Sequence, residues 1–115
     1  MHTEFATGQV KAKHEEDKQD LDDAHAILQK VSISKSELLR AIDFTLLFMR
    51  NNGTRFFGEE LVASLKREIT SENNQLLESV RPERFQNYIS EKHQWLKEVV
   101  GRMISKVAED QLKQL

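Results

Sequence analysis

The side chains that could take part in chemistry are gathered near the N-terminal end of the sequence. His14, Asp17, Asp22 and His25 lie within HEEDKQDLDDAH, a short stretch that combines imidazole and carboxylate groups. A metal site would need such ligands to converge and to be held by further hydrogen bonds. The acids here mostly fall on one polar helix face, and the H-E-x-x-H arrangement of zinc proteases is missing. We therefore expect solvated charge, with no metal and no cofactor.

No other pattern commits the chain to a reaction. The sequence has no cysteine, which excludes disulfides, thiolate metal sites and cysteine nucleophiles. It places no carboxylate pair for glycoside hydrolysis and no serine–histidine–acid set that can be assigned. Gly53 and Gly58 flank the segment TRFF, but the lysine and hydroxyl residue of a phosphate-binding loop do not follow. We expect a protein that is not an enzyme.

Composition favours a soluble all-α protein of one domain. The chain has 115 residues, including one proline and four glycines, and helix-forming residue types predominate. Aromatic and β-branched residues are too sparse for a sandwich or a barrel. The net charge of −2 does not make nucleic acid the default partner. No apolar run approaches the roughly 20 residues of a membrane span, so we expect a cytoplasmic location and no membrane contact.

Hydrophobic periodicity predicts a bundle of four or five helices with a long C-terminal helix. Residues 1–14 show no period and are predicted to form a disordered or loosely held tail, followed by a single helical domain over residues 15–115. The first helix is predicted to run from Glu16 to Val31. Its core positions would be Leu21, Ala24, Leu28 and Val31, with His25 partly buried beside them.

The second helix is predicted from Lys35 to Asn51, and Ser34 and Glu37 form a capping box at its start. Its second half is apolar almost all round, which places this helix at the centre of the core. Gly53 is the predicted left-handed stop. The N-x-T pattern at Asn52 is therefore interpreted as a helix end and not as a glycosylation site.

The third helix is predicted to begin at Gly58, the N-cap, with Phe57 packed on Val62 as a hydrophobic staple. The expected core positions are Leu61, Leu65 and Ile69. Thr, Ser and Asn in the segment ITSENNQ compete for backbone hydrogen bonds. The helix is therefore either bent there or followed by a short separate helix that contains Leu76, Leu77 and Val80.

The last helix is predicted from Pro82 to Gln111 and, at roughly 45 Å, is the longest. It would overhang its neighbours and leave an apolar stretch only partly covered within one chain. Exposed apolar surface of that extent usually contacts another protein, so we favour a homodimer. The alternative is that the acidic first helix packs alongside and covers the stretch. The dimerisation residues would be Val99, Val100, Met103, Ile104 and Val107.

These features favour a small cytoplasmic interaction or regulatory protein, of adaptor, chaperone or inhibitor type, whose partner is another protein. Interface anchors are often aromatic and arginine side chains, and the candidates here are Arg55, Phe56, Tyr88 and Trp95. Phe56 is preferred, because Phe56 and Phe57 cannot easily both enter one core. For Tyr88 and Trp95, burial in the core is the favoured alternative.

A dimeric DNA-binding regulator is the second hypothesis. Residues 60–80 can be aligned with a helix-turn-helix, with Glu60–Leu65 as the first helix and a recognition helix from Ser71 onward. The match is loose, because the turn glycine is replaced and the connecting segment is about two residues too long. The DNA contacts would come from Lys66 and Arg67 to phosphates, and from Asn73, Asn74 and Gln75 to adenine edges.

Overall fold

The computed structural model describes residues 18–53 and 56–113, and these residues form helices and connecting turns with no strand. The chain is helical from residue 18, the first described, to residue 28. Four further helices follow, which are α2 (Lys35–Asn51), α3 (Glu59–Ile69), α4 (Glu72–Val80) and α5 (Pro82–Lys113). The predicted all-α fold with a long C-terminal helix is confirmed.

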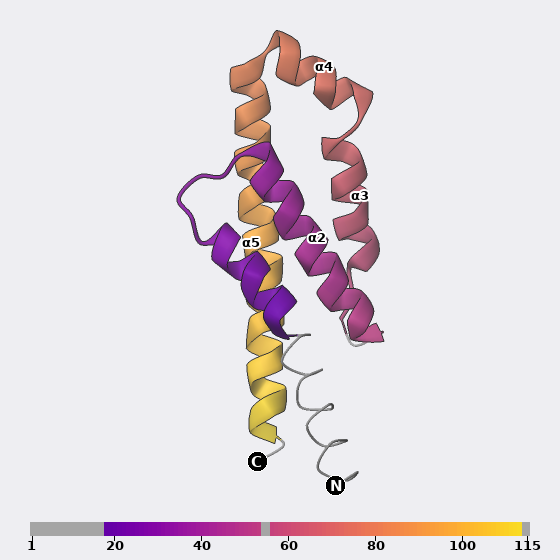
Figure 1. Ribbon diagram of the computed structural model, residues 1–115, viewed down its shortest axis with the longest axis vertical. Helices are drawn as coiled ribbons and strands as arrows, with labels where there is room; N and C mark the ends of the chain where they lie inside the picture. Colours follow the sequence, from indigo (N-terminus) through magenta and orange to yellow (C-terminus); the bar gives the residue numbers. More distant parts are fainter. Residues whose placement is uncertain (1–17, 54–55, 114–115) are drawn as a thin grey trace, which may run out of the picture.

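The long helix α5 runs along the whole molecule, and the other helices are arranged around it (Figure 1). Helix α2 packs against both α3 and α5, while α4 crosses one end and connects α3 to α5. The largest share of the buried side chains comes from α2, as expected of a central helix. They are Leu38, Ala41, Ile42, Thr45, Leu46, Phe48 and Met49.

The start of α2 agrees with the predicted capping box. The Ser34 hydroxyl accepts a hydrogen bond from the backbone N–H of Glu37, and the Glu37 carboxylate accepts one from the backbone N–H of Ser34. At the other end, Asn52 is the C-cap and Gly53 follows with φ +61°. That left-handed conformation suits glycine, which has no Cβ. The predicted left-handed stop is therefore confirmed.

The first helix ends earlier than predicted. The helical conformation ends at residue 28 and the chain then turns, so Val31 lies outside the helix and its side chain is 99% exposed. The prediction of Val31 as a core residue is wrong. Ile33 takes that place in the core, directly before the N-cap of α2. The predicted tail and the predicted helix start at Glu16 lie outside the described residues.

The region from 59 to 80 is two helices, not one bent helix. The break falls at Thr70 and Ser71, and the Ser71 hydroxyl caps α4 by accepting from the backbone N–H of Asn74 at 3.3 Å. Within α3 the buried residues are Val62, Leu65 and Ile69. The prediction that Leu61 faces the core is wrong, because Val62, three residues before Leu65, takes the inner face instead.

Six residues of α5 are buried along one face, namely Phe85, Ile89, His93, Leu96, Val100 and Met103. His93 lies between Ile89 and Leu96 on this buried face, and its Nε2 lies 2.8 Å from the carbonyl oxygen of Leu28. This contact ties the N-terminal helix to α5. The prediction that Val100 and Met103 are only partly covered within one chain is wrong, because both are buried. None of the described helices has both the length and the apolar character to cross a membrane.

Candidate docking groove

A groove lies between the start of α3 and the middle of α5, with a volume of about 360 Å³. From here on, "the docking groove" means this feature. On its α5 side, Trp95, Val99, Arg102 and Lys106 follow one another at spacings of four, three and four residues. That spacing places them along one face of a helix. The groove therefore has an apolar half, formed by Trp95 and Val99, and a basic half.

Phe56 forms part of the floor of the docking groove. Its side chain is 9% exposed, and its ring packs against the ring of Phe48 with 5.1 Å between centroids. The Lys106 ammonium lies 5.7 Å from the centre of the Phe56 ring, within the range of a cation–π contact. Phe56 is thus a core residue, and the prediction that it is the exposed phenylalanine is wrong.

Phe57 and Leu61 form the α3 side of the rim. The Phe57 side chain is 93% exposed and that of Leu61 is 64% exposed. The predicted staple between Phe57 and Val62 is therefore wrong, although Gly58 is the N-cap as expected. The reason is the backbone of Gly58, whose φ of +103° lies in the left-handed region. A staple accompanies an extended N-cap, whereas this conformation directs Phe57 away from the core.

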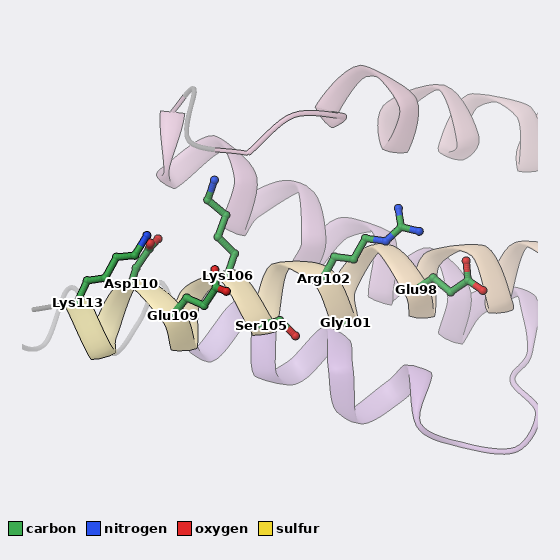
Figure 2. A pocket seen from close by; sticks show the side chains of 8 residues that line it. All are labelled: Glu98, Gly101, Arg102, Ser105, Lys106, Glu109, Asp110 and Lys113. Atoms are coloured by element: carbon green, nitrogen blue, oxygen red, sulfur yellow. The ribbon is translucent and has the colours of Figure 1, made fainter.

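Two cations mark the basic half of the groove. Arg102 and Lys106 are exposed and one helical turn apart on α5, and in the described part of the chain neither forms an ion pair. Figure 2 shows both side chains rising from the same side of α5, while Ser105 points to the opposite side. Two adjacent unpaired cations at a groove favour an anionic ligand group.

The residues drawn in Figure 2 line a second, more open hollow along α5, which shares Arg102 and Lys106 with the docking groove. Acidic and basic side chains alternate there at helical spacing, for example Glu98 with Arg102 and Glu109 with Lys113. Among the described residues, those that line this hollow all come from α5, so this part of it has the properties of a solvated helix face. The docking groove differs because α3 supplies a second, apolar wall.

The structure brings together only some of the predicted partner-binding residues. Trp95 and Phe56 line the docking groove, whereas Tyr88 does not. The Tyr88 hydroxyl donates a hydrogen bond to the Glu68 carboxylate at 2.5 Å and so joins α5 to the end of α3. Burial and the Glu68 carboxylate raise the pKa of Tyr88. Arg55 lies outside the described residues.

The predicted dimerisation residues divide into two groups. Val100 and Met103 are buried, while Val99, Ile104 and Val107 are partly buried against the core. The N-terminal helix contributes Leu21, Ala24 and Leu28 to the same core. Because cover comes from within the chain, a dimer built on all five residues would require the bundle to open. Self-association through the remaining surface of α5 stays a prediction.

Most of the residues proposed for DNA contact make hydrogen bonds within the chain. Lys66 pairs with Asp43 at 2.7 Å, and Arg67 pairs with Glu60 at 2.5 Å. The side-chain amide of Asn74 donates to the carbonyl of Glu68, and that of Gln75 donates to the carbonyl of Thr70. Asn73 is exposed. Contacts to bases or phosphates would have to replace these bonds, and DNA binding stays an untested hypothesis.

Six residues that line the docking groove were not among the predicted site residues, namely Phe57, Gly58, Leu61, Val62, Arg102 and Lys106. The adjacent phenylalanines indicated that one of the two would be exposed, but which one depended on the backbone of Gly58.

In the described residues, no three histidine, aspartate or glutamate side chains gather closely enough to hold a metal ion. No protein-family model matches the chain, and no curated protein or solved structure matches it significantly.

Proposed function

We propose that this chain is a non-enzymatic, cytoplasmic interaction protein of adaptor type, which binds a short amphipathic helix of another protein in the docking groove. The observation that carries the proposal is the exposure of Phe57 and Leu61 on the rim of an apolar groove. Large apolar side chains that gather at a concave surface commonly mark a binding site. Burial of these two side chains by a ligand would remove apolar surface from water and stabilise the complex.

A helix is the form of ligand that suits this site. The α5 wall presents its residues at helical spacing, and a helix that enters a groove uses anchors at similar spacing. The walls come from two rigid helices, α3 and α5, which pre-organises the surface and lowers the entropy lost on binding. Trp95 and Phe57 supply the aromatic contacts that usually contribute most of the binding energy.

The charge of the groove selects among amphipathic helices. Arg102 and Lys106 would pair with carboxylates at one end of the ligand, while Trp95 and Val99 contact its apolar side chains. Opposite charge mainly improves the association rate and the choice of partner. We therefore propose a ligand helix that carries Glu or Asp beside two leucine-like anchors.

The single tryptophan of the chain makes a direct test possible, because Trp95 lines the groove. A designed helical peptide with Glu, Leu and Leu at successive one-turn spacings is titrated while Trp95 emission is recorded. We expect a saturable change in emission, and at least about tenfold weaker binding by the same peptide with Lys in place of Glu. The variant Phe57→Ser with Leu61→Ser should lose binding, whereas Val31→Ser, which alters an equally exposed residue outside the groove, should not.

Reversing the charges of the groove provides a second test of the proposed function. Arg102→Glu with Lys106→Glu should invert the preference, so that the Lys peptide binds better than the Glu peptide. Arg81→Glu with Arg84→Glu changes exposed charge on the same chain by the same amount, outside the groove, and should leave the preference unchanged. The proposal is wrong if the groove variants bind the Glu peptide as tightly as the unaltered protein.

A further inference from the structure

We propose that the chain carries a ligand for its own groove, and that α4 of one copy binds in the docking groove of a second copy, head to tail. This inference rests on the proposed function, because it needs the groove to accept a helix. The structure supports it through the exposed outer face of α4, whose apolar anchors and charges match the groove in kind and in order.

Helix α4 is the least buried helix among α2 to α5, with no buried residue. Leu76 is 64% exposed and Val80 is 63% exposed. They are one turn apart and therefore lie on one face of the helix. This face has the two anchors that the groove requires.

The charges of α4 are complementary to the groove. Its charged residues are Glu72 and Glu78, with no lysine or arginine between Glu72 and Val80. Glu78 is already paired with Lys35 at 3.1 Å. Glu72 is exposed and lies one turn before Leu76, on the same face. It is thus the carboxylate available to Arg102 or Lys106 of another copy.

The order of these groups defines an orientation. Along α4 the sequence of groups is acid, apolar, apolar, at Glu72, Leu76 and Val80. Along α5 it is apolar, apolar, basic, from Trp95 and Val99 to Arg102 and Lys106. The two series match when α4 lies antiparallel to α5 of the second copy. Glu72 then meets the cations while Leu76 and Val80 meet Val99 and Trp95.

One chain cannot fill its own groove. Helix α4 crosses one end of the molecule, whereas the start of α3, which forms the groove wall, lies towards the other end (Figure 1). The occupant must therefore be a second copy. Because the two surfaces differ, each copy in the assembly can both donate α4 and accept one. An interface based on a short helix is small, so we expect weak, concentration-dependent association.

Analytical ultracentrifugation over a range of concentrations tests this. The unaltered protein should gain mass as concentration rises. The acceptor-deficient variant, Phe57→Ser with Leu61→Ser, and the donor-deficient variant, Leu76→Ser with Val80→Ser, should each stay monomeric. All four side chains are exposed, so both variants should fold, which circular dichroism checks. Arg102→Glu with Lys106→Glu is a second acceptor-deficient variant that changes no apolar residue.

Mixing the two variants gives the decisive result. One supplies an intact α4 and the other an intact groove, so an equimolar mixture should form a heterodimer and nothing larger. The inference is overturned if the unaltered protein stays monomeric at every concentration, if the donor-deficient variant self-associates normally, or if the mixture stays monomeric. If the Glu peptide still binds the groove in those cases, the proposed function stands and only the self-association fails.

Discussion

Helices α2 and α3 have the same apolar spacing at their starts, with one apolar residue before the N-cap and one four residues after it. The residue before the N-cap is buried at α2 and exposed at α3. At α2, Ile33 precedes the N-cap Ser34 and Leu38 follows four residues after the cap, and both apolar side chains are buried in the core. At α3, Phe57 precedes the N-cap Gly58 and Val62 follows at the same distance, but only Val62 is buried. One start has the pattern of a hydrophobic staple, and the other leaves its aromatic residue at the docking groove.

The backbone of the N-cap accounts for the difference. Ser34 has φ −80° and ψ 168°, the extended conformation usual at an N-cap, and its hydroxyl caps the helix. Gly58 has φ +103° and ψ 8°, and no side chain that could cap. The two N-caps differ in both backbone angles, and this difference directs the preceding side chain inward at α2 and outward at α3. Phe57 is therefore exposed because of the backbone of Gly58, and not because the core lacks an apolar site at that spacing.

The largest expected change in stability comes from truncating Ile33, the buried residue before the N-cap of α2. Ile33→Ala should destabilise the protein by about 2–5 kcal/mol, because it deletes buried methyl and methylene groups and leaves a cavity. Urea denaturation followed by circular dichroism measures this. Val31→Ala, two residues earlier and fully exposed, is the control and should change stability by less than about 0.5 kcal/mol. Similar effects at the two positions would contradict the burial of Ile33.

Gly58→Ala is the next largest perturbation. A Cβ at this position would meet no atom within 4 Å, so the cost comes from the backbone conformation alone. We expect a loss of about 1–2 kcal/mol, typical of a left-handed residue that carries a Cβ. Gly101→Ala in the middle of α5, where a Cβ also has open space, should instead stabilise by about 0.5–1 kcal/mol. Opposite signs for two chemically identical substitutions would support the role of φ.

Ser34→Ala removes the side-chain cap of α2 and should cost about 1 kcal/mol. The backbone N–H of Glu37 would lose its 3.2 Å hydrogen bond to the hydroxyl. Ser64→Ala, at an exposed position within α3, is the matched control and should be neutral or slightly stabilising, since Ala favours helix. No corresponding loss can be measured at α3, where no side chain caps the helix.

Features that depend on interactions between near neighbours in the chain could be predicted from the sequence. The bounds of α2, its capping box and the stop at Gly53 agree with prediction because each depends on local hydrogen bonds and dihedral preferences. Periodicity likewise placed α5, which was predicted from Pro82 to Gln111 and runs from Pro82 to Lys113. These signals act within a few residues of the chain, and the sequence contains all of them.

The errors share a different cause. Helical spacing allows either Leu61 or Val62 to face the core from α3, and either Phe56 or Phe57 to be buried. The structure buries Val62 and Phe56. Periodicity alone does not decide either choice. The left-handed backbone of Gly58 directs Phe57 outward, and packing against residues distant in sequence, such as the contact of Phe56 with Phe48, selects the buried residue. The docking groove could not be predicted for the same reason, because its two walls meet only in the folded chain.

The Glu37 carboxylate gives the capping box of α2 a small pH dependence. The Lys30 ammonium, and then the backbone N–H of Ser34, lower the pKa of Glu37 below its ordinary value of 4.5. The folded state therefore favours the charged form. Its contribution is fully present above the unfolded-state pKa and is lost as the pH falls through the lower folded-state pKa.

Thermal unfolding of the protein and of Glu37→Gln, compared from neutral to acidic pH, tests this linkage. The difference in melting temperature should shrink on acidification below about pH 4.5. It should also shrink at high salt, because the pair is exposed and screened. Glu91→Gln, an exposed change in α5, is the control. A difference that stays constant with pH would contradict a role for the charged carboxylate.

Phe57→Ala should have the smallest effect on stability of all these changes, within about 0.5 kcal/mol of zero, because the side chain is already in water. That near-neutral result is informative beside Ile33→Ala, since the two residues occupy equivalent positions before their helices. If Phe57 instead behaves like Ile33, the residue packs inward in solution and the docking groove loses its rim. If stability is unchanged while binding of the Glu peptide weakens at least about tenfold, the exposed phenylalanine serves a ligand and not the fold.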